Sequence, residues 1–123
     1  MTKASTQTRL ILEVMPAPAP GRTSMITLSS ILTDALALAI NYVPDQSVLT
    51  RASFDAYVRA LESAPATTPE ALAALVVDDI ANELVPKWLR VTVDRRSGGV
   101  VNHSVTVEDR QPGWDHPPLF KSP

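Results

Sequence analysis

Residues 35–61, ALALAINYVPDQSVLTRASFDAYVRAL, decide the fold class because their hydrophobic period changes partway along the stretch. In residues 35–43, leucine, isoleucine and tyrosine alternate with alanine and asparagine, as in a strand with one buried face. After a Val-Pro-Asp stop, apolar residues recur at the spacing of an amphipathic helix, at Phe54, Tyr57, Val58 and Leu61. The stretch therefore predicts a strand followed by a helix.

The segment before this stretch predicts one more strand. Met25–Leu28 is short and rich in β-forming residues. Further upstream, Pro16, Pro18 and Pro20 exclude a helix and a central strand, because proline fixes φ and lacks a backbone donor.

The segment after the stretch predicts a second helix over residues 68–84. Thr68 suits the N-cap, Pro69 the first helical position and Glu70 the first turn, while Pro86 ends the helix. Two β-rich runs, residues 88–93 and 100–107, then flank a turn signal that contains two glycines. These runs predict a hairpin.

The predicted order is strand, strand, helix, helix, strand, strand. This order indicates an α+β domain with a four-stranded antiparallel sheet and both helices covering one face. We expect the domain to span residues 10–110, with a flexible N-terminal tail over residues 1–9 and a proline-rich C-terminal tail over residues 111–123.

Length and composition exclude several functions. The chain has 123 residues and a mass of 13.3 kDa, which suits one domain. Its 11 basic and 13 acidic residues leave a net charge of -2, so no positive field favours nucleic acid or an anionic membrane surface. It has no cysteine, and it shows no apolar run of signal-peptide or membrane-span length. We expect a cytoplasmic protein.

Short motifs in the chain follow the order and nearly the spacing found in one enzyme family. They are Leu12-Glu13 with the prolines that follow, Tyr42-Val43-Pro44-Asp45, Ser53 with Tyr57, Asp78-Asp79-Ile80, and Pro86 to Val91. Together they resemble the NADPH-dependent 7-cyano-7-deazaguanine reductases, over roughly residues 12–108. The resemblance implies the tunnelling fold, whose sheets close between subunits into a ring. It also implies a homo-oligomer, a pentamer or decamer, with sites at subunit interfaces.

Two departures from this family exclude its reaction. The family attacks its nitrile with a cysteine, and this chain has none. The family's cofactor motif carries two lysines, and the corresponding positions here hold Ala52 and Asp55. An aspartate would repel the NADPH phosphate. We therefore expect no NADPH-dependent nitrile reduction and predict neither a cofactor nor a metal site.

Two carboxylates of the family pattern are kept. Asp34 falls in register with an aspartate that handles protons, and Glu70 with a glutamate that anchors the substrate, although Pro69 replaces the histidine beside it. A carboxylate can accept paired hydrogen bonds from the N–H and NH2 groups of a ring. We predict Asp34 and Glu70 as catalytic residues that converge on one cleft, with Glu70, Thr27 and Ser53 as substrate contacts.

Each of these residues also has an ordinary structural interpretation. Glu70 suits a first helical turn, Asp34 suits a turn, and His103 suits a surface or subunit interface. Two functional classes therefore stay open. The first is a non-redox enzyme of specialised metabolism, of cyclase, lyase or hydrolase type, acting on a small heteroaromatic or carbonyl substrate. The second is a non-catalytic protein of the same fold that binds such a ligand or serves as a scaffold. We favour the enzyme because both carboxylates remain where the cofactor motif is lost.

Overall fold

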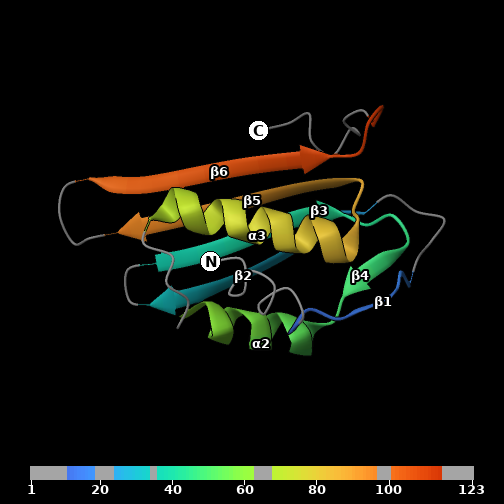
Figure 1. Cartoon of the computed structure of the whole chain (residues 1–123), viewed down its shortest axis with the longest axis horizontal. Helices are drawn as coiled ribbons and strands as arrows, with labels where there is room; N and C mark the ends of the chain where they lie inside the picture. The colour runs from blue at the N-terminus through green and yellow to red at the C-terminus, as the bar shows by residue number, and fades with distance from the viewer. Residues whose placement is uncertain (1–10, 19–23, 34–35, 63–67, 97–100, 115–123) are drawn as a thin grey trace.

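A computed structural model describes residues 11–18, 24–33, 36–62, 68–96 and 101–114. Its main sheet has four antiparallel strands in the order β2-β3-β5-β6 (Figure 1). Their bounds are β2 Ile26–Thr33, β3 Leu36–Val43, β5 Trp88–Arg96 and β6 Asn102–Arg110. Helices α2 (Arg51–Glu62) and α3 (Pro69–Leu84) pack on one face and share a single core with the strands. The predicted α+β class and element order are confirmed.

Strand β3 shows why the sheet has a buried face. Leu38, Ile40 and Tyr42 are at most 1% exposed, whereas Ala39 and Asn41 between them are half-buried. The alternation that the sequence shows thus separates the two faces of the sheet. The apolar face packs against α2 and α3. The apolar residues of the helices and of the strands therefore belong to one hydrophobic core.

Helix α3 begins where the sequence predicts. The hydroxyl oxygen of Thr68 accepts a hydrogen bond of 3.0 Å from the backbone N–H of Ala71, and Pro69 is the first helical residue. The helix ends at Leu84, and Val85 follows with a left-handed φ of 49°. Neither this helix nor any other in the described part of the chain is long and apolar enough to cross a membrane.

A buried hydrogen bond fixes α3 relative to α2. The hydroxyl of Tyr57 donates to Oδ2 of Asp79 at 2.8 Å, and both side chains are at most 1% exposed. Burial and the adjacent carboxylate raise the pKa of Tyr57 above its usual range. The two helices are therefore linked by a neutral hydroxyl and a carboxylate inside the core.

Two local features differ from the prediction. A small sheet pairs β1 (Val14–Pro16) with β4 (Ser47–Leu49), and the sequence does not predict this pair. Pro16 excludes a central strand but not an edge strand such as β1. Strand β2 also extends five residues beyond Leu28. Ser29 and Ser30 form strands only weakly by themselves, but they are part of β2 because they pair with β3.

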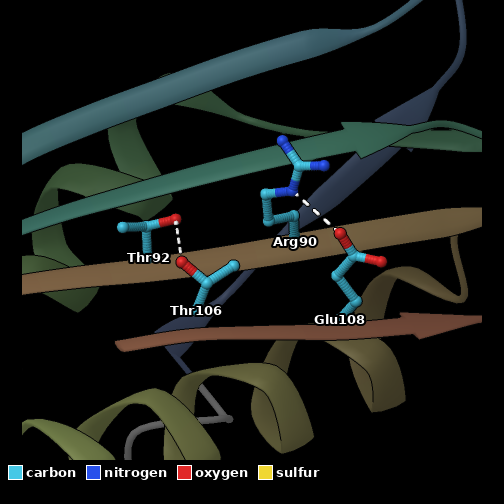
Figure 2. Close-up of polar contacts among 4 residues, drawn as sticks. All are labelled: Arg90, Thr92, Thr106 and Glu108. Atoms are coloured by element: carbon cyan, nitrogen blue, oxygen red, sulfur yellow. Dashed lines mark hydrogen bonds and ion pairs between the residues drawn. The ribbon is translucent and has the colours of Figure 1, made fainter. Parts of the chain in front are cut away.

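The face of the sheet opposite the helices is mostly polar. Beyond the buried pair Val43 and Trp88 at one end, it carries hydrogen bonds between neighbouring strands. The hydroxyls of Thr92 and Thr106 lie 3.3 Å apart, and Nε of Arg90 donates to Oε2 of Glu108 at 3.0 Å (Figure 2). This face therefore suits contact with water rather than with a second apolar layer.

Candidate functional site

Glu70 lies beside a histidine that comes from a distant part of the chain. It is the second residue of α3, and His103 is the second residue of β6. Nε2 of His103 is 3.1 Å from Oε2 of Glu70, and the side chains are 49% and 60% exposed, respectively. The carboxylate is thus held in place at one oxygen while both groups stay accessible to a ligand.

The topology explains this contact. Helix α3 packs against both β5 and β6, and the chain reverses between these strands, so β6 begins near the start of α3. In the β5–β6 register Arg95 pairs with His103. Residues directly opposite in an antiparallel pair have side chains on the same face with Cβ atoms about 5 Å apart. Arg95, His103 and Glu70 therefore lie together at one corner of the sheet.

Glu70 lies beside a helix N-terminus and beside His103, which is in the strand row that also contains Arg95. The carboxylate belongs to the first turn of α3, at the positive end of the helix dipole. The imidazole of His103 contacts one carboxylate oxygen, and Arg95 is the residue opposite His103 on the neighbouring strand. A carboxylate has about four acceptor positions. Glu70 can therefore keep its contact with His103 and still accept hydrogen bonds from a ligand.

A concave region lies between β2 and α2, away from Glu70. It has a volume of about 490 Å³ and is lined by Thr27, Leu28, Ser29, Ser30, Arg51, Phe54, Asp55 and Val58. Thr27 is on the polar face of the sheet, where its hydroxyl oxygen accepts a hydrogen bond of 2.7 Å from Nδ2 of Asn41. This groove is lined mainly by hydroxyls and apolar side chains.

Within one chain, Thr27 and Glu70 do not meet. Residues that pair across neighbouring strands form a row that crosses the sheet. Thr27 is in the same row as Arg90, whereas His103, the residue that contacts Glu70, is in the same row as Arg95. Five residues along β5 separate these rows, which corresponds to about 17 Å. The two residues also lie on opposite faces of the sheet. A ligand held by both would have to lie between copies of the chain.

Ser53 is a buried residue of α2. Its side chain is 5% exposed, and its hydroxyl oxygen lies 3.2 Å from the carbonyl of Glu13 and 3.1 Å from that of Thr50. A hydroxyl has one hydrogen to donate, and these carbonyls compete for it. Ser53 thus joins the N-terminal segment to α2, and its predicted contact with a substrate stays a prediction.

Asp34 lies outside the described residues. Its described neighbours Thr33 and Leu36 pair at the end of β2 and β3, and Leu36 is in the same cross-strand row as Arg95 and His103. Leu36 and His103 are two strand spacings apart, about 10 Å. The chain thus brings the segment that flanks Asp34 to the same end of the sheet as Glu70.

Arg95 and His103 are not among the site residues that the sequence predicts. The sequence predicts a hairpin turn between residues 93 and 100, which includes Arg95, and a surface or subunit-interface position for His103. A hairpin signal was visible between them, but the register that sets them opposite each other was not. The packing of β6 beside α3, which brings His103 to Glu70, is a long-range contact that no local pattern encodes.

The structure also describes the two positions at which the family's cofactor motif has lysines. Ala52 and Asp55 are exposed on α2, and Oδ2 of Asp55 is 3.0 Å from Nε of Arg59 one turn along. This ion pair raises the pKa of Arg59. Among the described residues, no three histidines, aspartates or glutamates gather closely enough to hold a metal ion.

Comparisons with known proteins agree with the fold. Residues 34–114 match the family described as QueF-like protein. The chain is 31% identical over 90 residues to the NADPH-dependent 7-cyano-7-deazaguanine reductase of Nitrosococcus oceani, covering 73% of this chain and 69% of that protein. The same-named protein of Syntrophus aciditrophicus is 26% identical over 116 residues, with coverages of 86% and 82%. The apo crystal structure of archaeosine synthase QueF-Like superposes with a TM-score of 0.58 and 19% identity, over 69% of this chain and 92% of that one.

Proposed function

Because this chain belongs to the QueF-like protein family, we propose that it acts on a small heteroaromatic or carbonyl substrate, in a non-redox reaction of cyclase, lyase or hydrolase type. Glu70 holds the substrate and Asp34 donates or accepts a proton. The observation that carries the proposal is the contact of 3.1 Å between His103 and an accessible Glu70 carboxylate. A carboxylate held in this way can accept N–H groups of a ring edge without first reorganising.

The residues of α2 do not fit NADPH, the cofactor in the names of the relatives. Helix α2 contains no lysine, and Asp55 places a carboxylate on its exposed surface. One of its two arginines, Arg59, already pairs with Asp55. The chain also lacks any thiol to attack a nitrile. The proposed reaction therefore uses neither hydride transfer from this cofactor nor a covalent thioimide.

We further propose that the chain forms a ring, a pentamer or a pair of stacked pentamers. Strand β2 is at an edge of the sheet and reads ITLSSILT, with no charge and no proline. Such an edge pairs readily with another strand unless it is covered. The opposite edge is β6, so copies of the chain can join edge to edge. The joint would bring β2 of one copy close to β6 and Glu70 of the next.

Two near-isosteric substitutions test the proposal. Asp34→Asn and Glu70→Gln preserve side-chain shape, so both should abolish turnover while light scattering shows an unchanged oligomer. Glu62→Gln, at an exposed position of α2, is the matched control and should keep full activity. The protein and its variants are incubated with purine, pterin and carbonyl compounds, and mass spectrometry then detects any product. Full turnover by both variants would contradict the assigned roles, and a bound compound that never changes would favour the non-catalytic alternative.

A further inference from the structure

The face of the sheet away from the helices has an open hollow over β2, β3 and β5. The hollow has a volume of about 450 Å³, and its lining includes Ser29, Ile31, Ala37, Ala39 and Asp94. The alternation in β3 explains it, because the large side chains of this strand point into the core and leave alanines on the other face. Thr92 and Thr106, shown in Figure 2, belong to the same row as Ala39 and border the hollow on the polar face.

An apolar side chain and a carboxylate lie on either side of this hollow. Ile31, Ala37 and Asp94 form one row across β2, β3 and β5. Ile31 is 71% exposed, although the face around it is mostly polar. Asp94 is half-buried, and it makes no hydrogen bond or ion pair with the other residues that the structure describes. The two residues are two strand spacings apart, about 10 Å.

This combination selects an organic cation. An ionised carboxylate only accepts hydrogen bonds, and its strongest partners are charged donors. A metal ion would need several oxygen ligands, and among the described residues no three carboxylates or histidines gather to supply them. An aliphatic amine carries a positive charge at neutral pH, and its chain can leave water by lying on alanine and isoleucine side chains.

We propose that this hollow binds a small aliphatic amine. The ammonium group contacts Asp94, and the chain lies over Ala37 and Ala39 with its end against Ile31. The site is independent of the proposed function, because it is on the face of the sheet opposite to the contact between Glu70 and His103.

Three probe compounds separate the contributions of the charge and of the chain. Pentylamine has both, 1-pentanol lacks the charge, and ethylamine lacks most of the chain. Saturation-transfer difference NMR on the full chain measures their affinities and works for an assembly of any size. Pentylamine should bind about tenfold more tightly than 1-pentanol, which loses the charge-assisted hydrogen bond. It should also bind about tenfold more tightly than ethylamine, which buries fewer methylene groups.

Two variants assign these contributions to residues. Asp94→Asn should weaken pentylamine about tenfold and leave 1-pentanol unchanged, because only the charge is lost. Ile31→Thr should weaken pentylamine about threefold and leave ethylamine unchanged, because only the end of the chain loses its contact. The matched controls are Asp109→Asn, at an exposed carboxylate on β6, and Val101→Thr, at an apolar residue that is 74% exposed. Neither control should change the affinity for pentylamine.

Several results would overturn the inference. They are equal affinities of the wild-type chain for pentylamine and 1-pentanol, an unchanged affinity in Asp94→Asn, and an equal loss in Asp109→Asn. The last would show that the amine responds to the overall charge of the chain. Circular dichroism verifies that each variant is folded, and Glu70→Gln should bind pentylamine as the wild type does.

A lysine side chain of another protein has the same chemistry as the free amine. Lysine blocked at its amino and carboxyl groups is therefore the fourth probe. It should bind more weakly than pentylamine, because the blocked backbone would stand at the apolar end beside Ile31. Tighter binding of the blocked lysine would overturn the free amine as the ligand and assign the hollow to a lysine of a protein partner.

Discussion

The two faces of the four-stranded sheet are built from alternate residues of the same strands, yet they have opposite character. On the helix side, Ile40 and Val91 pair across β3 and β5 and are 0% exposed. On the other side, the adjacent residues Asn41 and Arg90 pair across the same two strands and are partly exposed. The free energy that holds the fold is therefore concentrated on one face. The other face can carry polar contacts at little cost to stability.

Neighbouring substitutions on opposite faces should give the largest difference. Ile40→Ala removes a fully buried side chain from the core and should lower the free energy of unfolding by about 2–5 kcal/mol. Asn41→Ala removes one exposed hydrogen bond to Thr27 and should cost about 0.5–1 kcal/mol. Urea denaturation followed by circular dichroism measures both values. Equal losses for the two variants would show that the polar face is also buried, as in a tightly packed assembly.

The bond between Tyr57 and Asp79 should give the next largest effect, because it is a hydrogen bond between two buried side chains of the core. Tyr57→Phe removes the hydroxyl that donates to Asp79 and should destabilise the fold by about 1–3 kcal/mol at neutral pH. Val58→Ala, at a buried neighbour on α2, controls for general loosening of the helix. An unchanged free energy of unfolding for Tyr57→Phe would mean that the bond contributes nothing net.

The raised pKa of Tyr57 also predicts how the free energy of unfolding changes at alkaline pH. Its folded pKa is raised by burial, whereas in the unfolded chain it has the ordinary tyrosine value of about 10. Below that value both states keep the proton, and the stability from the neutral hydroxyl is fully present. Above it the unfolded state ionises first, so stability falls by up to about 1.4 kcal/mol per pH unit. Tyr57→Phe should lessen this fall without abolishing it, because burial also raises the pKa of Tyr42.

The sequence predicted the features that local physics determines. The N-cap at Thr68 placed Glu70 in the first turn of α3, and the alternation in β3 separated the faces of the sheet. The contact between Glu70 and His103 was not predictable in this way. It depends on the register of β5 with β6 and on the packing of α3 over both strands, which no local pattern specifies. The β1–β4 pair was missed because three-residue strands carry too few residues for a period to show.

The smallest effect should come from the ion pair on the polar face, between Arg90 and Glu108. Their side chains are 42% and 45% exposed, so water and salt screen the contact of 3.0 Å shown in Figure 2. A double-mutant cycle with Arg90→Ala and Glu108→Ala should give a coupling energy below about 0.5 kcal/mol, decreasing as salt is added. The cycle is needed because Arg90 also lies 4.9 Å from the ring centre of Trp88, so its single variant loses two contacts.

The pair Asp55 and Arg59, one turn apart on α2 and more exposed, gives the matched comparison for this last cycle. Two exposed ion pairs of equal length should have similar, small coupling energies whether a helix or a sheet carries them. A coupling between Arg90 and Glu108 well above that of the helical pair, and insensitive to salt, would show that the polar face is shielded from water in solution. The polar face would then be exposed in a single chain but covered when copies of the chain assemble.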